Sequence, residues 1–290
     1  MGIQDNPSFK DLASAGKGFE YLAPLAPIAD LFGDKGRVIA DALRQGAELA
    51  KQAAELGTLP DRFNQHYRAR GWIAFAEMHH EGMEEAVRLA EAGDLDAGEA
   101  ALVRVHDAQR LEFMVSRLNN IRAFHPRRDL VELALQDHLA GRYHASVPVF
   151  LAQIDGLVFD IAGKGFYETR EKELRHLEAK NTISGHADGL MALATEMSRN
   201  RRQTTTSVLS LPYRNGILHG RDLGYGDEVT SLKAICALAA LSEWARAHEA
   251  GTAQIEPPLE WLDPDTATWD DVRRLWGDLI VTLRNRPNAI

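Results

Sequence analysis

The sequence predicts an all-α protein in which a helical N-terminal region is followed by a C-terminal helical bundle. Apolar residues recur at three- and four-residue spacing along most of the chain, which is the pattern of amphipathic helices. Segments with the alternating pattern of a strand are nearly absent. Hydrophobic residues make up 45% of the 290 residues, which is enough for a sizeable core.

The first half of the chain divides into a lead-in and a helical region. Residues 1–33 are rich in proline, glycine and alanine, and we expect them to be loosely ordered. Residues 34–140 form the helical N-terminal region. Its predicted helices span 36–56, 61–92, 95–119 and 129–140, with Asp61 as the N-cap of the second helix and Gly93-Asp94 as the break before the third.

The predicted bundle spans residues 141–250 and begins after Gly141. Residues 143–161 are apolar on all sides, which predicts a central, buried helix, and a second buried helix is predicted at 229–249. Between them we expect a charged insertion at 166–185, irregular or with a short helix, and helices at 186–199 and 202–210. Residues 251–290 form a tail with one helix near 269–285.

The composition excludes several classes of protein. The net charge is −9, which is unlike the basic character of a general nucleic-acid binder. The single cysteine, Cys236, lies in an apolar run, so it allows no internal disulfide and no metal-ligand cluster, and a cytoplasmic location is expected. The chain has no run of about 18 apolar residues and no secretory signal pattern, so we expect no membrane span.

The segment Leu211-Pro212-Tyr213-Arg214-Asn215-Gly216-Ile217-Leu218-His219-Gly220 holds the candidate chemistry. It joins a fixed positive charge, Arg214, to His219, a side chain that titrates near neutral pH. Five helical residues separate two side chains by about 140° around the axis and about 7.5 Å along it. The pair therefore converges only in a short or distorted helix end, which Pro212, Gly216 and Gly220 favour. Pro212 suits the first turn of this helix, and Gly220 suits the cap at its far end.

These residue types suit the cleavage of a phosphodiester bond in RNA. Arginine binds phosphate and stabilises its developing charge, and histidine serves as general acid or base. Asn215 would orient the histidine or bind a phosphate oxygen. The attacking 2′-hydroxyl comes from the RNA, so neither a metal nor another cofactor is expected. One histidine rarely acts as both acid and base, so we expect a homodimer that brings two copies of the motif to one cleft.

A cluster of arginines surrounds this motif. Arg199, Arg201 and Arg202 precede it, and Arg221 follows it. They are the candidate RNA-binding residues, because clustered cations hold phosphates. The alternative is an arginine face that is merely solvated.

The region from about 141 to 248 resembles a HEPN domain. The resemblance rests on Arg214-Asn215-Gly216-Ile217-Leu218-His219-Gly220, on the apolar helix before it, and on residues 222–233, which hold a Tyr-Gly turn and a Ser-Leu-Lys helix start. It implies a four-helix bundle and a dimer with metal-independent endoribonuclease activity. The loop after Gly141 is short, so we expect the N-terminal region to pack on this bundle. The resemblance also implies a role in abortive infection, antiviral defence or as a toxin, with an antitoxin or defence-system protein as partner.

The resemblance also assigns roles to residues. Arg214 and His219 take the places of the catalytic pair, and Asn215 takes the variable polar position between them. Asp155, within 143–161, matches the acidic or polar residue that many members carry on the first bundle helix, facing the cleft. Its alternative role is a buried aspartate that bonds to the backbone or to a nearby arginine. Because some members only bind, the second hypothesis is a non-catalytic module for dimerisation or for binding RNA or protein.

Overall fold

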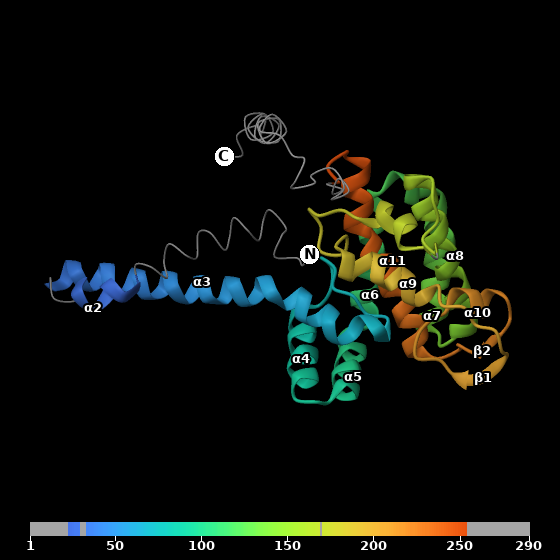
Figure 1. Ribbon diagram of the computed structural model, residues 1–290, viewed down its shortest axis with the longest axis horizontal. Helices are drawn as coiled ribbons and strands as arrows, with labels where there is room; N and C mark the ends of the chain where they lie inside the picture. The colour runs from blue at the N-terminus through green and yellow to red at the C-terminus, as the bar shows by residue number, and fades with distance from the viewer. Residues whose placement is uncertain (1–22, 30–32, 169, 254–290) are drawn as a thin grey trace, which may run out of the picture. The chain divides into compact units, whose positions relative to one another are not determined.

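The protein is mainly α-helical, as the sequence predicts, with one short two-stranded sheet (Figure 1). The computed structural model describes residues 23–29, 33–168 and 170–253. By its internal contacts the chain forms two units, Met1–Ile255 and Glu256–Ile290. Most of the predicted lead-in and of the predicted tail, including the helix near 269–285, lies outside the described residues.

Seven longer helices build the described part of the chain. They are α3 (Gly33–Tyr67), α4 (His80–Glu91), α5 (Leu95–Val105), α6 (Ala108–Arg117), α7 (Arg128–Leu139), α8 (Tyr143–Ala162) and α11 (Glu228–Glu249). Short helical segments connect them: η2 (Ala23–Leu25), α2 (Ala26–Ala29), η4 (Arg68–Arg70), η5 (Leu118–Asn120), η6 (Arg122–Arg127), η7 (Glu171–Leu177), η8 (Ala187–Met191), α9 (Ala192–Met197) and α10 (Arg214–Leu218). The two strands are β1 (Thr205–Val208) and β2 (Asp222–Gly224).

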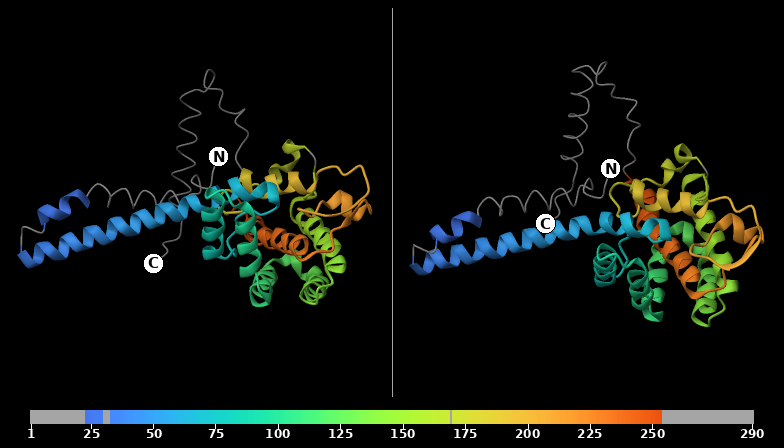
Figure 2. Two further views of the ribbon diagram at one scale, coloured as in Figure 1. Left: turned by 90° about the horizontal axis from the view of Figure 1, so that it is seen from below. Right: turned by 60° about the horizontal axis from the view of Figure 1, so that its bottom comes forward.

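Helix α11 lies at the centre of this fold. It is buried from Thr230 to Ala245, which confirms the second buried helix predicted from the sequence. It packs against α8, α7 and α6 (Figures 1 and 2). The many alanines of α11 let these neighbouring helices approach closely. Each large apolar side chain buried between the helices contributes about 1.5–3 kcal/mol to the stability of the fold. Helix α11 therefore joins elements from both sides of Gly141 in one core.

Helix α8 begins at Tyr143 and ends at Ala162, as predicted, and Gly163 stops it with a φ of 70°. The prediction that α8 is buried on all sides is wrong. Helices α7 and α11 cover one side, whereas the other side carries the half-buried Asp155 and Phe159, which is 58% exposed. Apolar residues on this uncovered side made the sequence pattern look uniform.

By length and composition, α8 is also apolar enough to cross a membrane. In this fold it is instead packed against α7 and α11, with Val147, Leu151 and Ile154 fully buried.

The boundaries predicted for helices 36–56 and 61–92 are wrong. Helix α3 runs without a break from Gly33 to Tyr67 and contains Pro60, so Asp61 lies inside a helix and is not an N-cap. The second predicted helix is interrupted after Tyr67, because residues 72–75 are buried one after another. A helix buries residues on one stripe, so four consecutive buried side chains require a non-helical segment that crosses the core.

Side-chain caps divide the chain where apolar spacing alone did not. The Nδ1 atom of His79 accepts a hydrogen bond from Gly82 N (3.1 Å), which sets the start of α4. The carboxylate of Asp107 accepts one from Arg110 N (2.8 Å), which splits the predicted helix 95–119 into α5 and α6. The helix predicted at 186–199 begins as the π-helical segment η8, in which Gly189 has non-helical φ and ψ angles.

The helix predicted at 202–210 is wrong, because this segment contains β1, which pairs in parallel with β2. Three consecutive threonines at 204–206 favour extended backbone, since β-branched side chains restrict χ1 in a helix. Gly224 allows the close approach of the strands, because a Cβ atom there would collide with the Ser207 carbonyl group.

A buried histidine at the junction of α7, α8 and α11 makes stability depend on pH. The Nδ1 atom of His138 lies 2.8 Å from Ser231 Oγ, which lies 2.7 Å from Ser146 Oγ. Burial lowers the pKa of His138 from its ordinary value of 6.5 to about 4. The unfolded chain therefore binds this proton more readily, and stability is lost as the pH falls from 6.5 toward 4, by about 3 kcal/mol in all.

We therefore expect His138→Gln to lose less stability than the parent chain between pH 7 and pH 4.5, by about 2–3 kcal/mol. Urea unfolding at both pH values measures this difference. The control is His144→Gln, since His144 is exposed at the start of α8. Equal losses of stability in His138→Gln and the parent would show that His138 is not the source of this pH dependence.

Candidate functional site

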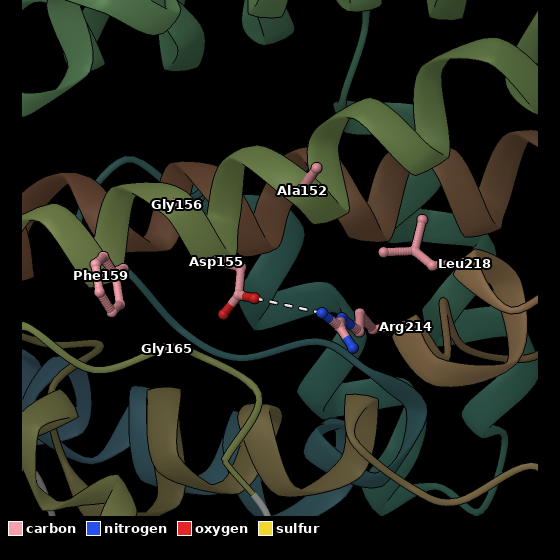
Figure 3. Close-up of a pocket in the computed structure, with 7 residues that line it drawn as sticks. All are labelled: Ala152, Asp155, Gly156, Phe159, Gly165, Arg214 and Leu218. Carbon is pink, nitrogen blue, oxygen red and sulfur yellow. Dashed lines mark ion pairs between the residues drawn. The ribbon is translucent and has the colours of Figure 1, made fainter.

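The uncovered side of α8 forms one wall of an open pocket of about 360 Å³. Helix α10 forms the opposite wall, and the turn after α8 closes one end. The residues that line the pocket are Ala152, Asp155, Gly156, Phe159, Gly165, Arg214 and Leu218 (Figure 3). Two of them, Asp155 and Arg214, are site residues that the sequence predicts, and the structure brings them together.

Helix α10 is a single helical turn whose end is fixed by backbone geometry. Gly220 has a φ of 65°, its N–H bonds to the carbonyl of Ile217 (3.1 Å), and Arg221 N bonds to the carbonyl of Gly216 (2.8 Å). This pair of bonds is the Schellman motif, which favours glycine at the left-handed position. The structure thus confirms Gly220 as the cap. Helix α10 itself begins at Arg214, two residues after Pro212, which was expected in its first turn.

Arg214 is held on several sides but keeps donors for a ligand. Its Nη1 donates to Asn215 Oδ1 (3.0 Å), its Nη2 lies 3.5 Å from Asp155 Oδ2, and its guanidinium lies 5.5 Å from the centre of the Tyr167 ring. Its Nε is buried and has no hydrogen-bond partner among the described residues. Each Nη atom carries two N–H donors and uses only one of them here, and the side chain is 30% exposed, so the Nη atoms can bind an anion in the pocket while Arg214 keeps its neighbours.

Asp155 bonds to the backbone and faces Arg214 from the edge of the pocket. Its Oδ1 accepts a hydrogen bond from Phe166 N (2.8 Å), which ties the turn after α8 back onto the helix. Its Oδ2 faces Arg214 across the pocket (Figure 3). The side chain is 31% exposed, so Asp155 lies at the pocket surface and is not a fully buried structural aspartate.

His219 does not line the pocket that holds Arg214. Residues four apart share one face of a helix, so Arg214 and Leu218 both point at α8, whereas the next residue is turned by about 100°. His219 is exposed at the C-cap of α10, and its ring makes no hydrogen bond or ion pair within the described part of the chain. The distortion that would bring His219 to Arg214 within one chain is therefore not present.

Asn215 contacts Arg214 and not His219. Its Oδ1 accepts from the arginine, and its Nδ2 donates to the carbonyl of Ser198 (3.1 Å). Both ends of the amide are thus occupied by protein groups. This geometry makes Asn215 a positioning residue for Arg214.

The four arginines around the motif have different surroundings. Arg199 pairs with Glu196 (2.8 Å), and Arg201 pairs with Asp222 (3.0 Å) and stacks on Tyr213 (4.6 Å). Arg221 donates to the carbonyl of Arg201 (2.9 Å). Arg202 is exposed and has no such partner within residues 170–253. The cluster is therefore partly neutralised, and Arg202 and Arg221 are the two members without a carboxylate partner in that range.

Gly216 is required by this same arginine cluster. Asp222 is fully buried next to α10, and a Cβ atom on Gly216 would collide with its carboxylate. The ion pair of Asp222 with Arg201 thus occupies the space that a side chain at Gly216 would need. The glycine of the motif has a packing role, independent of any chemistry.

The segment before α10 is held in place by α11 and by the N-terminal helices. Thr230 Oγ1 donates to the carbonyl of Leu209 (3.3 Å), and Lys233 Nζ donates to that of Ser210 (2.6 Å). Lys233 is 1% exposed, and its Nζ also lies 2.5 Å from Glu99 Oε1 on α5. Burial lowers the pKa of Lys233, and Glu99 partly offsets this effect. A buried ion pair therefore connects the N-terminal helices to the segment that carries Arg214.

Sequence reasoning missed the apolar part of the pocket. Phe159 and Leu218 lie within apolar helical runs, where they look like core residues, but they are 58% and 41% exposed. Gly165 and Tyr167 escaped notice because only the folded chain brings the turn after α8 to Arg214. The helical spacing of Phe159 from Asp155 was the one signal that could have pointed to the first of them.

Within the described residues, no group of three or more histidine, cysteine or carboxylate side chains lies close enough together to hold a metal ion. Comparison of the chain with protein-family models, curated proteins and solved structures finds no match.

Proposed function

We propose that this protein is a metal-independent endoribonuclease of the HEPN type, acting in the cytoplasm in phage defence or as a toxin. One observation carries the proposal: Arg214 lies in an open pocket, held by Asp155 and Asn215, and its side chain is 30% exposed there. An exposed histidine without a partner in the described residues, His219, follows on the same helical turn. A fixed guanidinium and a free imidazole are the two groups that RNA transesterification needs.

In the proposed reaction, the 2′-hydroxyl of the RNA attacks the adjacent phosphorus and its proton passes to a general base. The bond to the 5′-oxygen breaks, and a general acid protonates this leaving group. The products are a 2′,3′-cyclic phosphate and a 5′-hydroxyl. Arg214 would stabilise the extra charge on the phosphate oxygens, while Asp155 and Asn215 keep its guanidinium in place.

The proposal includes a homodimer, because His219 of one chain does not reach the pocket of the same chain. Exposed apolar side chains near the motif support a contact between copies: Leu218 on α10, Val208 on β1 and Leu223 on β2 are 41%, 75% and 52% exposed. A symmetric contact through this surface would bring two copies of His219 and Arg214 to one cleft. An antitoxin or another defence-system protein is the partner that this function would require.

The second candidate function is a non-catalytic module that binds RNA or protein. The outward position of His219 favours it, and so does the net charge of −9. Cleavage assays at fixed RNA concentration distinguish the two. A nuclease cuts RNA in the presence of a chelator and loses this activity in Arg214→Ala and His219→Ala, whereas a module binds RNA or a partner and cuts nothing.

Asp155→Asn tests the positioning of Arg214. The amide keeps an oxygen for Phe166 N but loses the charge that faces the guanidinium. We expect the rate of RNA cleavage to fall about tenfold, equivalent to about 1.4 kcal/mol in the barrier, with little change in melting temperature. The control is Asp137→Asn, which removes an ion pair with Arg142 at the end of α7. An unchanged cleavage rate in Asp155→Asn would show that the pair has no role in catalysis.

A further inference from the structure

The pocket wall on α8 has a regular pattern. Ala152, Asp155, Gly156 and Phe159 stand at positions i, i+3, i+4 and i+7, so they share one face of the helix. Helices α7 and α11 pack against the other side. Phe159 is apolar but 58% exposed, and it lies on the wall of a pocket whose centre is charged. An exposed aromatic ring in this place needs an explanation other than core packing.

The pocket has separate apolar and charged parts. Figure 3 shows Phe159 at one end and Leu218 at the other, with the Asp155–Arg214 pair between them. Gly156 stands between Asp155 and Phe159 on this wall, and a Cβ atom there would lie 2.8 Å from Arg127 Nη2, so a larger residue would require Arg127 to shift. A ligand that fills this space must therefore combine a flat apolar group with an anionic group about one helical turn away.

We propose that the pocket binds one unpaired nucleotide of a single-stranded RNA, with its base stacked on Phe159 and its phosphate on Arg214. This inference rests on the proposed function and names its substrate class. Side chains at i and i+4 are about 5–6 Å apart at Cβ, so Phe159 and the Asp155–Arg214 pair stand close enough for neighbouring parts of one nucleotide. Bases in a duplex are paired and stacked, so only an unpaired base can lie on the ring.

Stacking on Phe159 predicts little preference for a particular base, because every base has a π face. Beside the ring on this face, Gly156 has no side-chain atoms that could recognise a base edge. Specificity for unpaired RNA over duplex RNA is therefore expected, and specificity for sequence is not expected from this pocket.

The test is the affinity for a fluorescein-labelled, 2′-O-methylated single-stranded RNA of about ten nucleotides. This probe lacks the attacking hydroxyl, so binding is measured apart from cleavage. We expect Phe159→Ala to weaken binding about 5- to 150-fold and Phe159→Tyr to keep nearly full affinity. The matched control is Phe113→Ala, which removes a 46% exposed phenylalanine from α6, outside the pocket.

A second measurement confirms the stacking. The same RNA is prepared with one abasic position, moved along the strand. The parent chain should bind more weakly when the abasic position lies at Phe159, because the ring then has no base to stack on. Phe159→Ala should bind the intact and the abasic RNA equally, because it already lacks this contact. Loss of equal size in both chains would overturn the stacking role.

The outcomes separate this inference from the proposed nuclease function. Weaker binding by Phe159→Ala supports the stacking role even if no chain cuts RNA. Unchanged binding by Phe159→Ala overturns it, even if cleavage depends on His219. Failure of the parent chain to bind the probe overturns it as well. An effect of Phe159→Ala on dimer dissociation alone, with RNA affinity unchanged, would assign the ring to a contact between copies.

Discussion

Replacement of Arg214 by alanine is expected to lower the rate of RNA cleavage by about 10²–10³-fold, which is the usual cost of removing one preorganised donor from a transition state. The guanidinium is held by Asn215 and faces Asp155, so it requires little rearrangement when charge develops on the phosphate. Arg214→Lys keeps the charge but loses the planar set of donors, and an intermediate rate is expected. Single-turnover cleavage of a labelled RNA measures all three rates.

The control for this series is Arg88→Ala, which removes an exposed arginine paired with Glu85 on α4. It should leave cleavage unchanged. Because Arg214 is 30% exposed, its removal should change the melting temperature little. A rate for Arg214→Ala within about twofold of the parent would exclude Arg214 from the reaction, since it corresponds to less than about 0.5 kcal/mol in the barrier.

The second large effect is expected from Lys233→Met, which should lower the free energy of unfolding by about 1–3 kcal/mol, because a buried carbonyl loses its donor while Glu99 keeps Arg70 and Trp72 as partners. The substitution leaves Glu99 without its nearest cation and removes the donor to the carbonyl of Ser210. Burial raises the pKa of Glu99, but Lys233, together with a hydrogen bond from Trp72 and the charge of Arg70, outweighs burial, so the pKa is lowered overall. The stabilisation from the Glu99 carboxylate is therefore present at neutral pH. It is lost in acid, as the pH falls from the ordinary pKa of a glutamate through the lower pKa of Glu99 in the folded chain.

A double-mutant cycle with Glu99→Gln isolates the pair. The double variant should be more stable than the two single losses predict, by about 1–3 kcal/mol, because the contact between the two groups can be lost only once. The exposed pair of Arg88 and Glu85 is the control, and its coupling should stay below about 1 kcal/mol. Additive losses of stability in the Lys233 and Glu99 variants would show that the two groups are not coupled.

The sequence predicted the parts of the fold that rest on helical periodicity. Helices α8 and α11 and the cap at Gly220 follow from local patterns, and the structure has them where they were expected. The errors have local physical causes. Trp72–Phe75 is buried as a non-helical segment that crosses the core, and the threonines of β1 pair with a strand that lies more than a dozen residues later in the chain.

The candidate site was predictable only in part. Arg214 and Asp155 were expected near one cleft, and they lie across one pocket. The outward direction of His219 depends on the exact length of α10, which the Schellman motif at Gly220 sets. Phe159 was hidden in an apolar run, because composition does not show which side of a helix its neighbours cover. The N-terminal support through Glu99 and Lys233 joins residues far apart in the sequence.

The role of His219 is tested by comparing RNA cleavage by the parent chain and by His219→Ala in the presence of a chelator, with the product ends identified. His144→Ala, which removes an exposed histidine from α8, is the control. We expect the parent and the control to cut RNA and leave 2′,3′-cyclic phosphate ends, and His219→Ala not to cut. Cleavage that requires an added metal ion and survives in His219→Ala would contradict the proposed function.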